Sequence, residues 1–253
     1  MRLTKEERAA RKASFREMSL AGKADYIYTY FKLPILLGLI ALYLVCSAVY
    51  RQVTKKEAVL YTAFVNVSVG DELESQLNEG FISASGADPR KAEIYLYRGT
   101  YLSDDPSAEN HEYGYASKLK LMAAIEARQL DIVLMNKEAY DICSQKGYLL
   151  ELPDLLPDSQ YRFLEPDLTT NTVILEDNAI EYALRESDRY QAVTEEVTNG
   201  IDVSTFPLFQ EAGFSDSVYL GVVANSPRLP AVMQYISYLA GMQADQTQAV
   251  GMG

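Results

Sequence analysis

The residues with the most evident chemical potential lie in the stretch ENHEYGYASK, residues 109–118. His111 and Glu112 begin like the zinc-protease motif HExxH, but Tyr115 stands where the second histidine would be. Zinc favours several nitrogen or sulfur ligands in close array, and His111 is the only histidine in the chain. The sequence therefore predicts neither a zinc site nor a zinc-protease mechanism.

Calcium is the other metal that this stretch could hold, because carboxylates surround the histidine. The segment DDPSAEN, residues 104–110, lacks the alternating oxygen ligands and central glycine of an EF-hand loop. A solvated acidic loop is the simpler interpretation, and no metal is predicted. The carboxylates concerned are Asp104, Asp105, Glu109 and Glu112.

Nucleophilic catalysis has little support in the sequence. There is no G-x-S-x-G elbow, no Walker motif and no Rossmann fingerprint. Cys143 lies among Tyr140 and Ile142 at helical spacing, which favours a buried and inert thiol over a dyad with His111. We therefore expect a protein that is not an enzyme and needs no cofactor, with a hydrolase as a distant alternative.

Tyrosine is the remaining residue type that could form a binding site, with 19 tyrosines and no tryptophan in the chain. Several of them follow one predicted strand at its carboxyl end, where open α/β sheets bind ligands. Tyrosine offers an apolar ring and a hydroxyl, which suits sugars, peptides or a protein partner. Ordinary core and rim positions are the alternative. The candidate binding residues are Tyr97, Arg98, Tyr101, Tyr113 and Tyr115, and Asp104 or Asp105 could instead pair with the arginine.

An uncharged segment of 18 residues, LPILLGLIALYLVCSAVY at positions 33–50, separates two differently charged parts of the chain. As a helix it would be about 27 Å long, close to the thickness of a bilayer's hydrocarbon core. Lys32 and Arg51 flank it, and aromatic residues precede it. No small-x-small site closes the run and 32 residues precede it, so we expect a retained membrane anchor instead of a cleaved signal peptide.

The charges on either side of this segment predict its orientation. Residues 1–56 hold 11 Lys/Arg against four Asp/Glu, and residues 57–253 hold 12 against 31, a net charge of −19. The positive-inside rule then places the N-terminus in the cytoplasm and the acidic part outside. Cys143 is the one cysteine in that part, so no disulfide can form within it, which is compatible with the cell envelope of a bacterium. An acidic domain of this charge repels phosphate, so nucleic acid is not an expected partner.

The pattern of apolar residues predicts how the chain is organised. Apolar runs at 58–67, 93–99 and 130–135 alternate with helical segments at 71–86, 116–129 and 137–147, which favours an open and mainly parallel sheet with helices on both faces. The helix at 116–129 is expected to bury Leu119, Met122, Ala123 and Ile125. A strand at 171–177, further helix within 178–200, a strand at 218–224 and a helix at 229–240 are also predicted.

These elements divide the chain into five parts. A basic cytoplasmic tail with an aromatic interfacial segment occupies 1–32, including a charged helix at 4–18. The transmembrane helix follows at 33–50 and a juxtamembrane linker at 51–57. An extracytoplasmic α/β domain spans 58–241, with residues 157–215 as a small second lobe, and a flexible tail occupies 242–253.

Two segments resemble the type 2 extracellular solute-binding proteins of ABC importers. IEARQLDIVLMNKEAYDICSQKGYLLELPDLLPD, residues 125–158, has that family's order of helix, strand ending in Asp-Ile-Val, helix and Gly-x-Leu-x-x-Leu. YLGVVANSPRLPAVMQYISYLA, residues 219–240, is similar to its return segment. The resemblance implies a reduced solute-binding-protein fold in a short membrane-anchored form.

The resemblance and the charge pattern together predict a non-catalytic function. The chain would be a single-pass membrane protein that presents a solute-binding-like or accessory domain to an ABC transporter or another envelope complex. Its partners would be permease subunits, or a small solute such as a sugar or peptide. The alternative is a structural or sensory anchor whose outer domain binds another envelope protein.

Overall fold

The structure is a computed structural model that describes residues 19–54, 56–104, 111–185, 187, 189–214 and 216–242. It divides the chain into two units, Met1–Lys55 and Lys56–Gly253. We call the second unit the sheet domain. The predicted helix at 4–18 lies outside the described residues, as does the tail from residue 243 onward.

The first unit contains one long helix, α2, at Leu20–Thr54. Within it, Lys32–Tyr50 is long and apolar enough to cross a membrane, and none of that window is buried in the protein. A signal sequence would meet the same criteria of length and composition. The predicted linker at 51–57 is largely helical instead, because residues 51–54 contain no glycine or proline to end the helix.

The sheet domain is built on six strands. In chain order they are β1 at Glu57–Val65, β2 at Ala92–Thr100, β3 at Ile132–Met135, β4 at Leu168–Asp177, β5 at Ala192–Asp202 and β6 at Tyr219–Val222. They form one open sheet in the order β2-β1-β3-β6-β5-β4. The sheet is mixed, which corrects the mainly parallel arrangement that the sequence predicted: β1 runs parallel to β2 and β3, whereas the pairs β3–β6, β6–β5 and β5–β4 are antiparallel.

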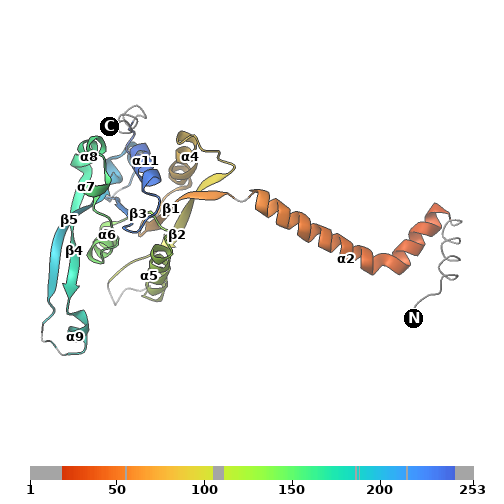
Figure 1. Cartoon of the computed structure of the whole chain (residues 1–253), viewed down its shortest axis with the longest axis horizontal. Coiled ribbons are helices and arrows are strands. Elements are labelled where there is room, and N and C mark those ends of the chain that lie inside the picture. The colour runs from red at the N-terminus through yellow and green to blue at the C-terminus, as the bar shows by residue number, and fades with distance from the viewer. Residues whose placement is uncertain are drawn as a thin grey trace. The chain divides into compact units, whose positions relative to one another are not determined.

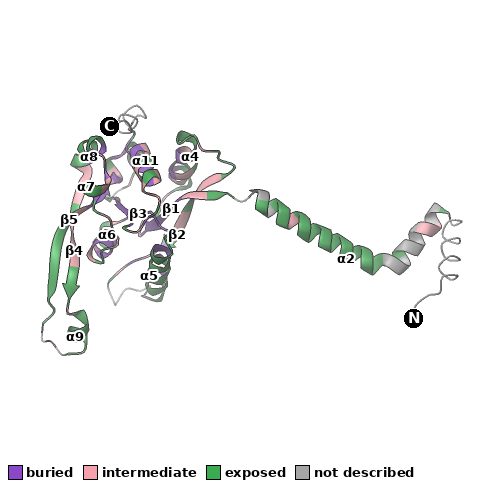
Figure 2. Cartoon of the chain, in the orientation of Figure 1, coloured by how far each residue is buried: buried purple, intermediate pink, exposed green. Residues whose placement is uncertain are grey.

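Helices cover both faces of this sheet, as predicted (Figure 1). Because successive side chains in a strand point to opposite faces, Leu60 and Phe64 of β1 join one core and Ala63 and Val65 join the other. The first core packs against α3 at Asp71–Ser75, the π-helical turn η1 at Gln76–Gly80, α4 at Phe81–Ala84 and α11 at Leu229–Leu239. The second packs against α5 at His111–Glu126 and α6 at Lys137–Gln145. Figure 2 shows these buried residues around the central strands.

Helix α5 differs from its prediction in two ways. It begins at His111, so the stretch that was expected to be a loop forms its first turns. It also buries Leu121, Ala124 and Ile125, whereas Leu119 and Met122 remain 49% and 39% exposed. The predicted apolar stripe therefore lies largely on the outer face of the helix.

The predicted second lobe is not a separate unit, because its strands belong to the same sheet. After α7 at Leu152–Leu155, residues 157–215 form α8 at Asp158–Leu164, η2 at Glu165–Asp167, strands β4 and β5, η3 at Val203–Thr205 and α10 at Pro207–Ala212. Helix was expected across much of 178–200, yet among the residues described there only α9 at Ala179–Ala183 is helical, and β5 was missed. Among the described residues of the sheet domain, residues 157–215 thus extend the one sheet instead of forming a separate lobe.

The hairpin of β4 and β5 extends beyond the rest of the sheet, with α9 at its far end (Figure 1). We call residues 173–196 the arm. Its outer residues are exposed on both faces, whereas Val197, Asn199 and Ile201 nearer the sheet are buried.

Candidate functional site

Two of the predicted tyrosines, Tyr101 and Tyr113, lie where the carboxyl end of β2 meets the first turns of α5. The Tyr113 hydroxyl donates a hydrogen bond to the Gly99 carbonyl. Gly99 has a φ of +62°, a conformation that favours glycine. Tyr101 packs beside the next helical residue, since a Cβ on Gly114 would lie 3.4 Å from its Cδ1 atom. Tyr101 and Tyr113 therefore both lie at the junction between the end of β2 and the first turns of α5.

Tyr97 lies beneath this pair, on the sheet face that α5 covers. Its ring centroid is 4.9 Å from that of Tyr95, and the Lys120 ammonium lies 5.6 Å from its centroid. Burial, followed by the neighbouring phenols of Tyr95 and Tyr61, raises the pKa of the Tyr97 hydroxyl. Tyr97 is thus a half-buried packing residue whose hydroxyl stays protonated and neutral.

Arg98 does not join the tyrosines. It forms an ion pair with Glu74 of α3, whereas Asp104 pairs with Lys118 of α5 and Asp105 lies outside the described residues. Tyr97 and Arg98 are neighbours in a strand, so their side chains leave opposite faces of the sheet. The five predicted residues are therefore divided between two faces and do not line one crevice.

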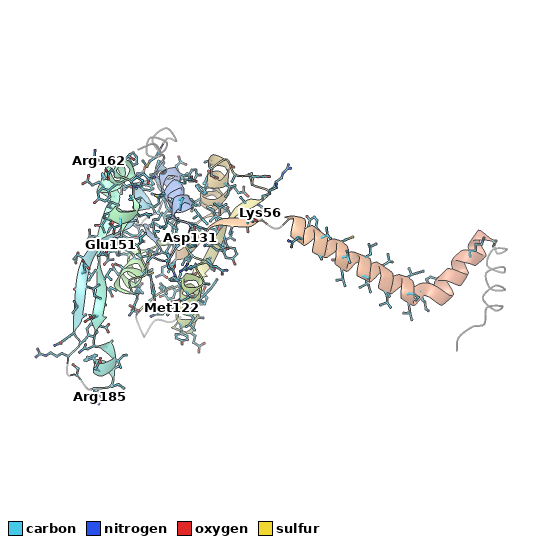
Figure 3. All side chains as sticks on the ribbon, in the orientation of Figure 1. Lys56, Met122, Asp131, Glu151, Arg162 and Arg185 are labelled. Carbon is cyan, nitrogen blue, oxygen red and sulfur yellow. The ribbon has the colours of Figure 1, made fainter. Side chains whose placement is uncertain are left out.

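The outer face of α5 forms an exposed apolar surface that the sequence interpretation missed. Tyr115, Leu119 and Met122 are spaced by four and three residues and are 61%, 49% and 39% exposed. We call these three residues the α5 stripe. Figure 3 labels Met122 on α5, and Tyr113 beside the stripe is 53% exposed.

The described part of the sheet domain contains no cluster of three His, Cys, Asp or Glu residues that could hold a metal ion. The His111 side chain and residues 105–110 lie outside that part, so the predicted acidic loop is not described. The candidate site consists of aromatic and aliphatic surface, which suits contact with another molecule.

Cys143 is buried in α6, as its helical spacing predicted, and is 1% exposed. Burial raises the pKa of its thiol to about 12. A rise of that size lowers the fraction of nucleophilic thiolate at neutral pH about a thousandfold. The site thus offers no activated cysteine.

We expect the single thiol of a Cys46→Ser variant to resist alkylation by iodoacetamide at pH 8 while the protein is folded. The rate should be about a thousandfold below that of the same variant unfolded in urea, because both thiolate fraction and access are lost. Mass spectrometry over a time course measures both rates. Comparable rates with and without urea would show that Cys143 is accessible in the native protein.

A buried carboxylate connects the two segments that carry the family resemblance. Asp131, just before β3, is fully buried, and its Oδ1 accepts a hydrogen bond from Ser226 Oγ at 2.6 Å. Its Oδ2 accepts from the backbone N–H of Tyr61 and from Nε of Arg228, each at 2.8 Å. The Arg228 guanidinium lies 4.5 Å above the Tyr61 ring. We call Asp131, Ser226, Arg228 and Tyr61 the Asp131 cluster; Figure 3 labels Asp131 in the interior of the domain.

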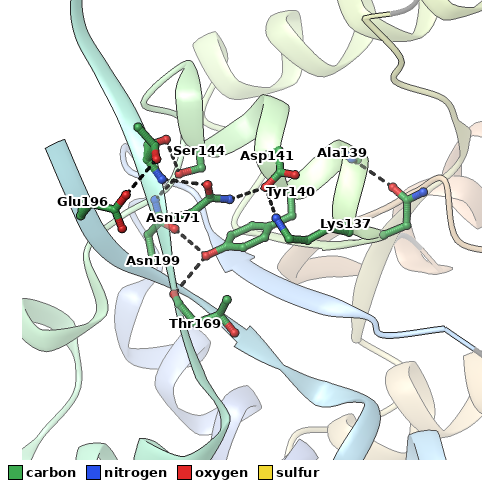
Figure 4. Close-up of polar contacts among 11 residues, drawn as sticks. Lys137, Ala139, Tyr140, Asp141, Ser144, Thr169, Asn171, Glu196 and Asn199 are labelled. Atoms are coloured by element: carbon green, nitrogen blue, oxygen red, sulfur yellow. Dashed lines mark hydrogen bonds and ion pairs between the residues drawn. The ribbon is translucent and has the colours of Figure 1, made fainter. Parts of the chain in front are cut away.

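A second polar network attaches α6 to β4 and β5 (Figure 4). The Tyr140 hydroxyl lies 3.0 Å from the Thr169 carbonyl and 2.9 Å from Asn199 Oδ1. Asn199 donates to Ser144 Oγ at 2.8 Å, and Ser144 donates to the Thr172 carbonyl at 3.1 Å. Because β4 is an edge strand, these side chains close part of a sheet edge that would otherwise be open to pairing.

This network is structural in character. Tyr140, Ser144 and Asn199 are each 0% exposed, so no substrate could reach them. Burial, followed by the nearby Asp141 carboxylate, raises the pKa of the Tyr140 phenol, which therefore remains a neutral hydrogen-bonding group.

No protein-family model, curated protein or solved structure matches the chain significantly. The function must therefore be argued from the residues and from their arrangement in the sheet domain.

Proposed function

We propose that this protein is a membrane-anchored, non-catalytic accessory protein whose sheet domain binds another protein of a bacterial envelope complex. The helix at Lys32–Tyr50 would serve as a single-pass anchor, with the N-terminus in the cytoplasm and the sheet domain outside. The resemblance of residues 125–158 and 219–240 to type 2 solute-binding proteins suggests an ABC transporter as the complex and a permease subunit as the partner.

The observation that carries this proposal is the exposed α5 stripe in a domain without a second lobe. Solute-binding proteins of this type hold their ligand between two lobes, whereas residues 157–215 here extend a single sheet. Aromatic and aliphatic side chains that stay exposed at helical spacing are typical of a helix face that packs against a protein partner. Protein binding is therefore better supported than solute binding.

The two segments of the resemblance do lie together. β3 of the first pairs with β6 of the second, and the Asp131 cluster joins them. They form the structural centre of the domain, and a shared architecture there would leave the surfaces around it free to differ.

We expect Leu119→Glu to reduce recovery of the partner about tenfold when the tagged full-length chain is purified from cells that naturally carry it. A carboxylate at the centre of the α5 stripe would have to be desolvated on binding. Gln210→Glu is the control, because Gln210 is exposed on α10, which packs against the opposite face of the sheet from α5. Quantitative mass spectrometry of the co-purified permease measures the difference.

A solute site is tested on the full chain in nanodiscs by thermal unfolding against panels of sugars and peptides. We expect no change in the unfolding temperature. A concentration-dependent rise with one ligand, together with equal permease recovery for Leu119→Glu and Gln210→Glu, would overturn the proposal and favour a solute-binding role.

A further inference from the structure

The far end of the arm presents the largest collection of exposed apolar side chains in the described part of the sheet domain. Ile180 of α9 is 72% exposed, and Leu184, four positions later at the C-cap of that helix, is 64% exposed. Further exposed apolar residues lie around them on the same hairpin. These are Leu175 at 56%, Tyr182 at 50%, Tyr190 at 47% and Val193 at 57%. We call these six residues the arm tip; Figure 3 labels the neighbouring Arg185 at this end of the molecule.

The arm tip is held in shape by its own polar contacts. Asn178 Nδ2 donates to Ser187 Oγ at 3.1 Å and to the Arg189 carbonyl at 2.9 Å, while its Oδ1 accepts from the Gln191 N–H at 2.6 Å. The Tyr190 hydroxyl donates to Asp177 Oδ2 at 3.1 Å. A hairpin that satisfies its own polar groups can keep apolar side chains pointing outward.

Exposure of this kind has an energetic consequence. A two-stranded hairpin buries little apolar surface by itself, so it adds little to the stability of the domain. Six exposed apolar side chains contribute hydrophobic free energy only when another surface covers them. Burying an exposed Ile or Leu against a partner removes its apolar surface from water, which is favourable. The arm tip could therefore contribute substantially to binding while contributing little to the stability of the free domain.

The charges around the arm tip indicate what would cover it. Residues 175–193 hold five Asp or Glu against two Arg, and residues 57–253 carry a net charge of −19. A second copy of the chain and an anionic lipid surface would both meet this acidic surface with charge of the same sign. A protein with an apolar groove bordered by Lys or Arg would match both the apolar side chains of the arm tip and the acidic residues around them.

We propose that the arm tip is a docking site for a protein of the same envelope complex, whose surface presents an apolar groove bordered by basic residues. This inference rests on the proposed function and adds a second contact surface to the α5 stripe. Glu176, Asp177 and Glu181 would face the basic border, and Ile180 and Leu184 would enter the groove.

The experiment places the photo-cross-linking residue p-benzoylphenylalanine in the full-length chain, in cells that naturally carry the protein. The test position is Ile180, with Leu119 in the α5 stripe as a second position and exposed Glu211 of α10 as a control. We expect Ile180 to give an adduct with an envelope protein, mapped by mass spectrometry to an apolar segment flanked by Lys or Arg. Glu211 should give none.

Charge reversal tests the acidic border. Glu176→Lys with Glu181→Lys, added to the Ile180 probe, should lower the yield of that adduct at least tenfold. The matched control, Asp154→Lys with Glu211→Lys, changes two exposed acids elsewhere in the domain and should leave the yield unchanged. Equal thermal unfolding curves would show that both double variants are folded.

The other outcomes separate the two proposals. Adducts from Ile180 to the chain itself or to lipid alone, or an adduct that survives charge reversal, would overturn the arm-tip inference. An adduct from Leu119 with none from Ile180 would overturn it as well and leave the proposed function standing. No adduct at either position would overturn both.

Discussion

Replacing Asp131 with alanine is expected to lower the free energy of unfolding of the sheet domain by about 3 kcal/mol. Removing one partner of a buried pair leaves the charge of the other partner uncompensated and leaves hydrogen-bond donors unsatisfied. The Asp131 carboxylate is fully buried and accepts three hydrogen bonds, from Tyr61, Ser226 and Arg228. Arg228 keeps 26% of its side chain exposed, so water can partly solvate it after the change. We therefore place the effect at the lower end of the range for buried pairs.

Urea unfolding of the full chain in detergent micelles, followed by circular dichroism, measures this loss. Arg228→Ala is the companion variant, and the double variant should cost at least 1 kcal/mol less than the sum of the two single changes, because both remove one shared interaction. Strict additivity, or a loss below 1 kcal/mol for Asp131→Ala, would show that the Asp131 cluster does not hold the two segments together.

Replacing Gly200 with alanine is expected to lower the free energy of unfolding by about 2 kcal/mol through overpacking. Gly200 is buried in β5, and an added Cβ would lie 2.6 Å from Cζ and from the hydroxyl oxygen of Tyr140. Tyr140 cannot withdraw easily, because it is 0% exposed and stacks on Tyr219 with a centroid distance of 4.9 Å. The network that joins α6 to β4 and β5 would have to shift.

The same unfolding assay separates this clash from the general effect of losing a glycine. Gly70→Ala is the matched control, because an added Cβ there meets no atom within 4 Å, and it should cost less than about 1 kcal/mol. In a Tyr140→Ala background, Gly200→Ala should become nearly neutral, since the atoms it would overlap are gone. An equal cost with and without the Tyr140 ring would contradict the overpacking explanation.

The candidate site was predictable in composition but not in arrangement. The tyrosines near the end of β2 were identified from their number and position, and the Tyr113–Gly99 contact and the packing of Tyr101 against Gly114 confirm that this end of β2 meets the start of α5. Arg98 was misplaced because its partner, Glu74, lies 24 residues earlier on α3. Helix α3 packs on the face of the sheet opposite to the one that carries Tyr97. Pairing across that distance depends on how α3 packs, which local spacing does not encode.

The sheet shows the same division. Residues 58–67 and 130–135 read as strands from their apolar and β-branched content, and β1 and β3 confirm them. The direction of β6 and the pairing of β4 with β5 were missed. Two acids in TEEVT, residues 194–198, hid the strand character of β5, and the inner half of that strand is buried only because β4, β6 and α6 cover it.

Helix α5 shows most clearly what the sequence alone determined and what the tertiary structure decided. Its residues predict a helix, and they form two apolar stripes along it. One stripe is Tyr115, Leu119 and Met122, and the other is Leu121, Ala124 and Ile125. Periodicity belongs to the helix itself, so either stripe could have been the buried one. The sheet selected the second, because Val65, Val133 and Met135 form the surface against which those side chains pack. The first stripe was left exposed, and it is the surface proposed for partner binding.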